Sequence, residues 1–123
     1  MARFIGFGIL IVWNGGFLAN FNRGGALWVL ELNSEKTPTL IATTMGGKTE
    51  VLGTWAYVIS KSEPENPLWI VEESEASFAG VVQWYHQRKF YDTLVRETQG
   101  GATRAFTREK NGGRAALSLY RSR

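Results

Sequence analysis

Residues 22–32, NRGGALWVLEL, place the pair Gly24-Gly25 directly before an apolar run of β-forming residues, Ala26–Leu32. Glycine reaches positive φ without a Cβ clash, which the tightest turns between strands require. Four more pairs of this kind punctuate the chain: Gly15-Gly16, Gly46-Gly47, Gly100-Gly101 and Gly112-Gly113. The pattern predicts a chain of strands that glycine turns cut into hairpins.

The segments between the glycine pairs have the composition of strands. Further strands are expected at Phe4–Trp13, Phe17–Phe21, Pro38–Met45, Thr49–Ser60 and Leu68–Glu72. Within Thr49–Ser60, a period of two would put Val51, Gly53, Trp55, Tyr57 and Ile59 on one face, and Gly53 is a candidate bulge. A last hairpin is expected to join Ala102–Lys110 to Arg114–Ser122. Most of the five tryptophans are expected in the core.

Residues 76–99 carry a different pattern. Phe78, Val81, Val82 and Tyr85 follow the spacing of one helical face, although a second apolar set falls on the opposite side. We therefore expect a β-rich α+β fold: a mostly antiparallel sheet or partly closed barrel of hairpins, with one helical segment near 77–98. An all-β fold is the alternative. The length predicts a single domain spanning residues 1–123.

The chemistry open to the chain is narrow. It has no cysteine, so disulfides, thiol catalysis and zinc–thiolate sites are excluded. His86 is the only histidine and Asp92 the only aspartate. The segment ending in Gly46-Gly47-Lys48-Thr49 resembles a loose phosphate-binding loop, but a strand is expected after it where that loop needs a helix. We predict no cofactor and no metal site.

Charge is distributed unevenly along the chain. Residues 103–123 hold six arginines and lysines against one glutamate, a net charge of +5, while residues 61–75 hold five glutamates against one lysine, a net charge of −4. In the expected C-terminal hairpin, cations alternate with aromatic rings, which suits binding to phosphates and bases of single-stranded nucleic acid. The candidate contact residues there are Arg104, Phe106, Arg108, Lys110, Arg114, Tyr120 and Arg121.

A second polar and aromatic cluster could support that surface. Tyr85, Arg88 and Lys89 lie in it beside His86. The sequence therefore favours a non-enzymatic nucleic-acid-binding domain of low sequence preference. A small metal-independent nuclease, with a histidine or tyrosine as the acid–base group, is a distant third hypothesis.

The alternative function is a structural subunit of a virion or protein complex. Glu63, Glu65, Glu72, Glu73 and Glu75 could meet the basic segment of a neighbouring subunit, giving a homo-oligomer or a larger assembly. The apolar run Phe4–Trp13 is far shorter than the roughly 20 residues of a membrane helix, so no membrane span is expected. Either function fits a cytoplasmic or virion-associated protein.

Overall fold

The computed structural model describes residues 10–12, 20–35, 39–58, 66–85, 90–110 and 116–123. In this part of the chain every regular element is a strand. The strands are β1 (Leu10–Val12), β2 (Asn20–Arg23), β3 (Ala26–Glu35), β4 (Ile41–Thr44), β5 (Lys48–Val58), β6 (Trp69–Glu72), β7 (Glu75–Tyr85), β8 (Thr93–Gln99), β9 (Ala102–Thr107) and β10 (Ala116–Arg121).

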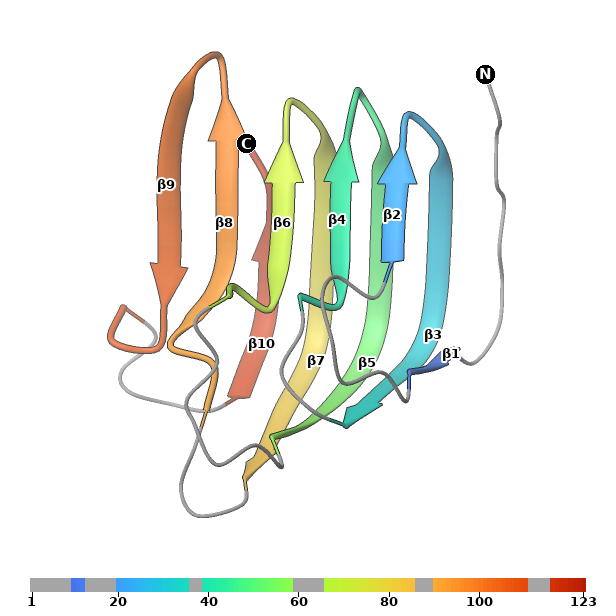
Figure 1. Ribbon diagram of the computed structural model, residues 1–123, viewed down its shortest axis with the longest axis vertical. Helices are drawn as coiled ribbons and strands as arrows, with labels where there is room; N and C mark the ends of the chain where they lie inside the picture. Colours follow the sequence, from blue (N-terminus) through green and yellow to red (C-terminus); the bar gives the residue numbers. More distant parts are fainter. Residues whose placement is uncertain (1–9, 13–19, 36–38, 59–65, 86–89, 111–115) are drawn as a thin grey trace.

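The strands form two five-stranded sheets, which face each other in Figure 1. One has the order β1-β3-β5-β7-β10 and is called the long sheet, after the length of β3, β5 and β7. The other, the short sheet, has the order β2-β4-β6-β8-β9. From β2 to β8 the chain passes from one sheet to the other at each strand, and each strand lies parallel to its predecessor in the same sheet. The backbone thus winds as a flattened solenoid.

The winding ends at the C-terminal side. There β9 turns back and pairs antiparallel with β8, and β10 pairs antiparallel with β7. Both sheets are therefore mixed, and the predicted mostly antiparallel arrangement of hairpins is wrong. Parallel neighbours need a long connection, which the alternation between sheets supplies.

The predicted helix near 77–98 is also wrong, because none of the described residues of this stretch is helical, and most of them lie in β7 and β8. In β7, Gly80 has a φ of +67° and interrupts the alternation of the strand. Phe78 and Val81 consequently both face the interior although they are three residues apart, whereas Val82 is 50% exposed. A strand whose alternation is interrupted in this way imitates the spacing of a helical face. The all-β alternative is confirmed for the described residues, because every regular element in them is a strand.

The irregularity at Gly80 is repeated across the long sheet. Glu31 in β3 and Gly53 in β5 also have positive φ, of 63° and 82°, and the three lie between the same register pairs of neighbouring strands. The candidate bulge at Gly53 is thus a backbone irregularity, but the predicted face through it is wrong. Val51 points inward before it, and Trp55, 56% exposed, points outward after it.

Glycine pairs form corners between the sheets as well as turns within one. Gly24-Gly25 and Gly46-Gly47 join short-sheet strands to long-sheet strands, so neither is the predicted hairpin turn. Gly100-Gly101 does turn a hairpin, between β8 and β9. Neighbouring corners are hydrogen-bonded: the N–H of Gly24 donates to the carbonyl of Thr44 over 2.9 Å, and the N–H of Gly46 to that of Glu73 over 3.0 Å. The pairs at 15–16 and 112–113 lie outside the described residues.

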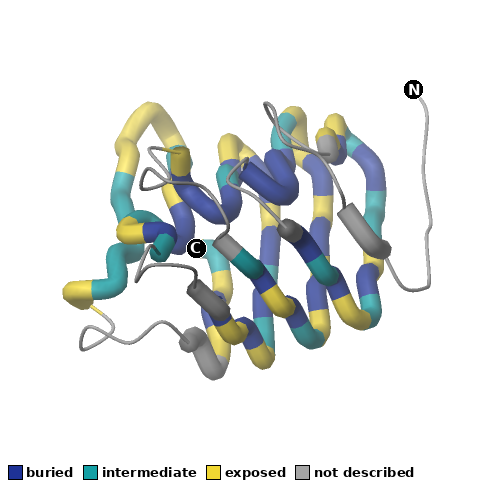
Figure 2. Tube along the Cα trace, turned by 60° about the horizontal axis from the view of Figure 1, so that its bottom comes forward, coloured by how far each residue is buried: buried dark blue, intermediate teal, exposed yellow. Residues whose placement is uncertain are grey.

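The core lies between the two sheets, and buried and exposed residues alternate along the strands that enclose it (Figure 2). Trp69 of the short sheet stacks on Phe78 of the long sheet with ring centroids 4.2 Å apart. Tyr120 of β10 continues this stack, 6.1 Å from Phe78, and Phe106 of β9 packs against Tyr120 at 5.8 Å. The aromatic column thus joins the antiparallel end of the molecule to its parallel part.

Candidate docking face on the long sheet

The residues predicted to form one basic hairpin are divided between the two sheets. β9 belongs to the short sheet and β10 to the long sheet, so the predicted pairing of Ala102–Lys110 with Arg114–Ser122 does not form among the described residues. Arg88, Lys89 and Arg114 lie outside the described residues. Tyr85 is the last residue of β7.

Two of the predicted contact residues meet around a buried carboxylate. Glu97 of β8 is 1% exposed, and the guanidinium of Arg104 donates to it from Nη2 over 2.8 Å and from Nε over 3.2 Å. The Tyr120 hydroxyl donates to the same carboxylate, and the backbone N–H of Arg123 lies within 3.4 Å of both its oxygens. These groups link β8, β9 and the chain end beyond β10.

The pKa values in this cluster follow from burial and these hydrogen bonds. Burial opposes ionisation of Glu97, but the donors from Arg104, Tyr120 and Arg123 outweigh it and hold the pKa of Glu97 below its usual range. Burial, together with the bond to Glu97, raises the pKa of Tyr120 well above its usual range. The cluster is therefore an ionised glutamate held by its donors, which is a structural role.

The remaining cations of this region also have partners or lie elsewhere. Arg108 pairs with Asp92 at 3.0 Å and covers the ring of Phe90, and Lys110 donates to the carbonyl of Ala105 over 2.7 Å. Arg121 differs, because it projects from the outer face of the long sheet beside Ser77. The structure thus brings Arg104, Phe106 and Tyr120 together but separates them from Arg121.

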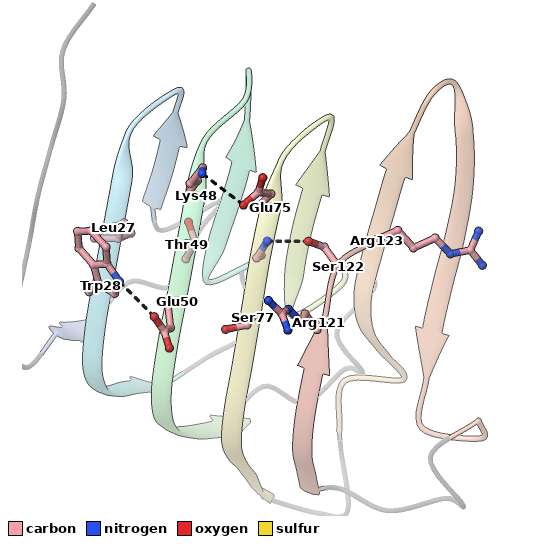
Figure 3. Close-up of a pocket in the computed structure, with 11 residues that line it drawn as sticks. Leu27, Trp28, Lys48, Thr49, Glu50, Glu75, Ser77, Arg121, Ser122 and Arg123 are labelled. Carbon is pink, nitrogen blue, oxygen red and sulfur yellow. Dashed lines mark hydrogen bonds and ion pairs between the residues drawn. The ribbon is translucent and has the colours of Figure 1, made fainter.

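On the outer face of the long sheet, strand register aligns residues in rows, four of which lie between Lys48 and Trp55 of β5. The end row pairs Lys48 of β5 with Glu75 of β7, whose side chains form an ion pair at 3.6 Å. The next row runs across β3, β5, β7 and β10 as Trp28, Glu50, Ser77 and Arg121. Its Trp28 indole donates to Glu50 over 3.1 Å (Figure 3).

The two remaining rows are mainly apolar. The third consists of Leu30, Leu52, Ala79 and Leu119, and the fourth of Asn33, Trp55 and Val82. Leu52 is 46% exposed and Leu119 is 65% exposed. Because the positive-φ residues Glu31, Gly53 and Gly80 lie between these two rows, both rows point to the same side of the sheet.

A shallow trough of ≈ 470 Å³ crosses the polar end of this face. Trp28 and Glu50 line one side of it, and Arg121 and Arg123 line the other (Figure 3). Within the described part of the chain, the guanidinium of Arg121 has no partner. The face therefore combines exposed apolar rings and chains with charges of both signs.

Sequence reasoning missed this face. Trp28 and Trp55 are large apolar residues, which the expected core would have contained. The alternation Lys48, Glu50, Leu52 was the available signal, because two charged residues at a period of two mark the outward side of a strand. That signal fails beyond Gly53, because the alternation of inward and outward residues along β5 shifts by one residue there.

Among the described residues, no group of three or more potential metal ligands occurs. The same ranges hold no helix that is long and apolar enough to cross a membrane. Comparisons of the chain with protein-family models, curated proteins and solved structures found no match.

Proposed function

We propose that the chain is a non-enzymatic subunit of a protein assembly and that the outer face of the long sheet is its contact surface. The observation that carries this proposal is the apolar area formed by the third and fourth rows. Four large apolar side chains there are about half exposed or more: Leu52 46%, Val82 50%, Trp55 56% and Leu119 65%. Single exposed apolar residues are ordinary, whereas a contiguous group marks an interaction surface.

The size of the face supports the same proposal. Strands lie about 4.8 Å apart and rise about 3.3 Å per residue, so four strands over ten residues cover about 600 Å² in projection. Because side chains project from the sheet, its accessible area is larger than this projected area and approaches the ~800 Å² that each partner contributes to a standard protein interface. Tryptophan and arginine at the polar end are residue types enriched in such interfaces.

Nucleic-acid binding is the competing proposal, and the distribution of charge gives it less support. Glu97 and Asp92 neutralise Arg104 and Arg108, so the cations counted in the sequence do not act as one free patch. Arg121 and Arg123, which line the trough, have Glu50 and Glu75 in the same trough. A surface of both signs suits a protein partner better than a polyanion.

One experiment separates the two proposals. The mass of the purified chain is measured by size exclusion with light scattering, over a range of concentrations, at low and high salt, with and without a single-stranded polynucleotide. An assembly that forms without the polynucleotide supports the docking face. A chain that stays monomeric alone and binds the polynucleotide with steeply salt-dependent affinity supports nucleic-acid binding and contradicts our proposal.

A further inference from the structure

The outer face of the long sheet is complementary to itself. In the end row, a cation on β5 stands beside an anion on β7. In the second row, an aromatic ring on β3 and a cation on β10 stand at opposite ends. In the apolar rows, a large residue on β5 neighbours a smaller one on β7, as Leu52 does Ala79. A pattern of paired opposites can be satisfied by a copy of itself rotated by 180°.

We propose that a second copy of this chain binds face to face on the outer side of the long sheet, with the two-fold axis parallel to the strands and midway between β5 and β7. This operation exchanges β5 with β7 and β3 with β10, and it leaves every row opposite itself. The inference rests on the proposed function, since it names the partner of the docking face. Two sheets stacked in this way lie about 10 Å apart, so side chains of both fill the space between them.

The rotation brings opposite charges together in the end row. Lys48 of one copy lies opposite the partner's Glu75, and Glu75 opposite the partner's Lys48. The two side chains are 67% and 70% exposed, so both are available for such contacts. In the second row, Trp28 lies opposite the partner's Arg121, which suits a cation–π contact.

The apolar rows also match under this rotation. Leu52 lies opposite the partner's Ala79, and Leu30 opposite the partner's Leu119. In the fourth row, Trp55 lies opposite the partner's Val82. Large residues thus face smaller ones near the axis, which is the arrangement that lets two layers interdigitate.

Neighbouring positions of the axis are unfavourable. An axis directly over β7 would place Glu75 against the partner's Glu75. An axis directly over β5 would place Lys48 against the partner's Lys48 and Glu50 against the partner's Glu50. Like charges face each other in both cases, so of these three positions only the midway axis pairs unlike charges.

Charge reversal tests this register. Lys48→Glu and Glu75→Lys are prepared as separate proteins, and sedimentation velocity measures the dimerisation constant of each and of their equimolar mixture. Each variant alone puts like charges across the axis, so its dimer is expected to weaken about 100-fold. In the mixture, every pair across the axis is again of opposite sign, and dimers should return. Within each chain, residues 48 and 75 still repel, so only contact between chains explains that recovery.

The outcomes separate this inference from the proposed function. Circular dichroism and the urea midpoint check that both variants fold. If the unmodified chain dimerises but the mixture shows no recovery, or if either variant dimerises like the unmodified chain, the register is wrong while the docking face stands. If the unmodified chain alone is monomeric at every concentration, a second copy is not the partner and this inference is wrong. If that monomer also binds the single-stranded polynucleotide with steeply salt-dependent affinity, the proposed function is wrong as well.

Discussion

Glu97 and Arg104 form a two-bond ion pair across β8 and β9, with 2.8 Å between Oε1 and Nη2 and 3.2 Å between Oε2 and Nε. The carboxylate is 1% exposed and the Arg104 side chain 37% exposed. The pair therefore holds the antiparallel hairpin at the end of the solenoid, together with Tyr120 of β10. The contribution of this ion pair to the free energy of unfolding can be measured by removing the charge of Glu97 alone.

Glu97→Gln is expected to lower the free energy of unfolding by about 3 kcal/mol, because Arg104 loses its counterion and the site keeps the same shape. Urea unfolding measures the change. Asp92→Asn is the matched control, since it removes the exposed pair with Arg108 and should cost less than about 1 kcal/mol. Equal effects of the two variants would show that burial of Glu97 has no energetic consequence.

The same glutamate predicts how stability depends on pH. Its pKa is lower in the folded chain than the value of about 4.3 expected when unfolded, because the donors outweigh burial. The unfolded state therefore takes up the proton first, and the stabilisation is complete above about pH 4.3 and is lost as pH falls through the folded pKa. Between pH 5 and pH 3, the unfolding free energy should fall less steeply for Glu97→Gln than for the unmodified chain. Parallel curves would contradict this assignment.

The three positive φ angles that are aligned across the long sheet predict opposite effects of adding and removing a side chain. Gly53 and Gly80 have φ of +82° and +67°, so Gly53→Ala and Gly80→Ala should each destabilise by about 1 kcal/mol. Glu31 carries a side chain at φ +63°, and Glu31→Gly relieves its strain. Thermal unfolding compares the three variants. A loss of stability in Glu31→Gly as large as in Gly80→Ala would mean that backbone strain does not decide these positions.

Asn22 links two corners of the solenoid through its side-chain amide. Its Nδ2 donates to the carbonyl of Lys48 and to Thr49 Oγ1, both at 2.9 Å, and its Oδ1 accepts from the N–H of Gly25. Asn22→Ala should cost about 2–3 kcal/mol, because it removes three hydrogen bonds, among them the buried one from the N–H of Gly25. Thr98→Ala, which removes an exposed bond to Thr103, should cost less than about 1 kcal/mol in the same urea experiment.

The sequence predicts individual strands better than their arrangement. The sequence predicts strands near β3, β5 and β6, and they form there, because period-two patterns and glycine pairs are local signals. The winding of the chain between the sheets depends on contacts between residues far apart in the sequence. One Gly-Gly pair can turn a hairpin, as Gly100-Gly101 does, whereas another forms a corner between the sheets, as Gly46-Gly47 does. Unequal stretches of chain separate the register partners Asn20, Ile41, Trp69 and Val95, so no repeat is visible.

The candidate site was hidden by the same features. The change of phase at Gly53 sends Trp55 outward, where a strict period of two would have grouped it with buried Val51. The basic residues stand out in the sequence by their charge, but the sequence does not show which carboxylates pair with them. Nothing in the local pattern around Arg104 indicates that Glu97 neutralises it across a hairpin.

The most direct test of the central claim is the mass of two matched variants by sedimentation equilibrium. Leu52→Asp places a charge in the middle of the apolar rows, whereas Met45→Asp changes an apolar residue that is 75% exposed at a corner outside the long sheet. We predict that the unmodified chain and Met45→Asp associate and that Leu52→Asp, folded by circular dichroism, is monomeric at the same concentrations. Association of Leu52→Asp with the affinity of the unmodified chain would contradict the docking face.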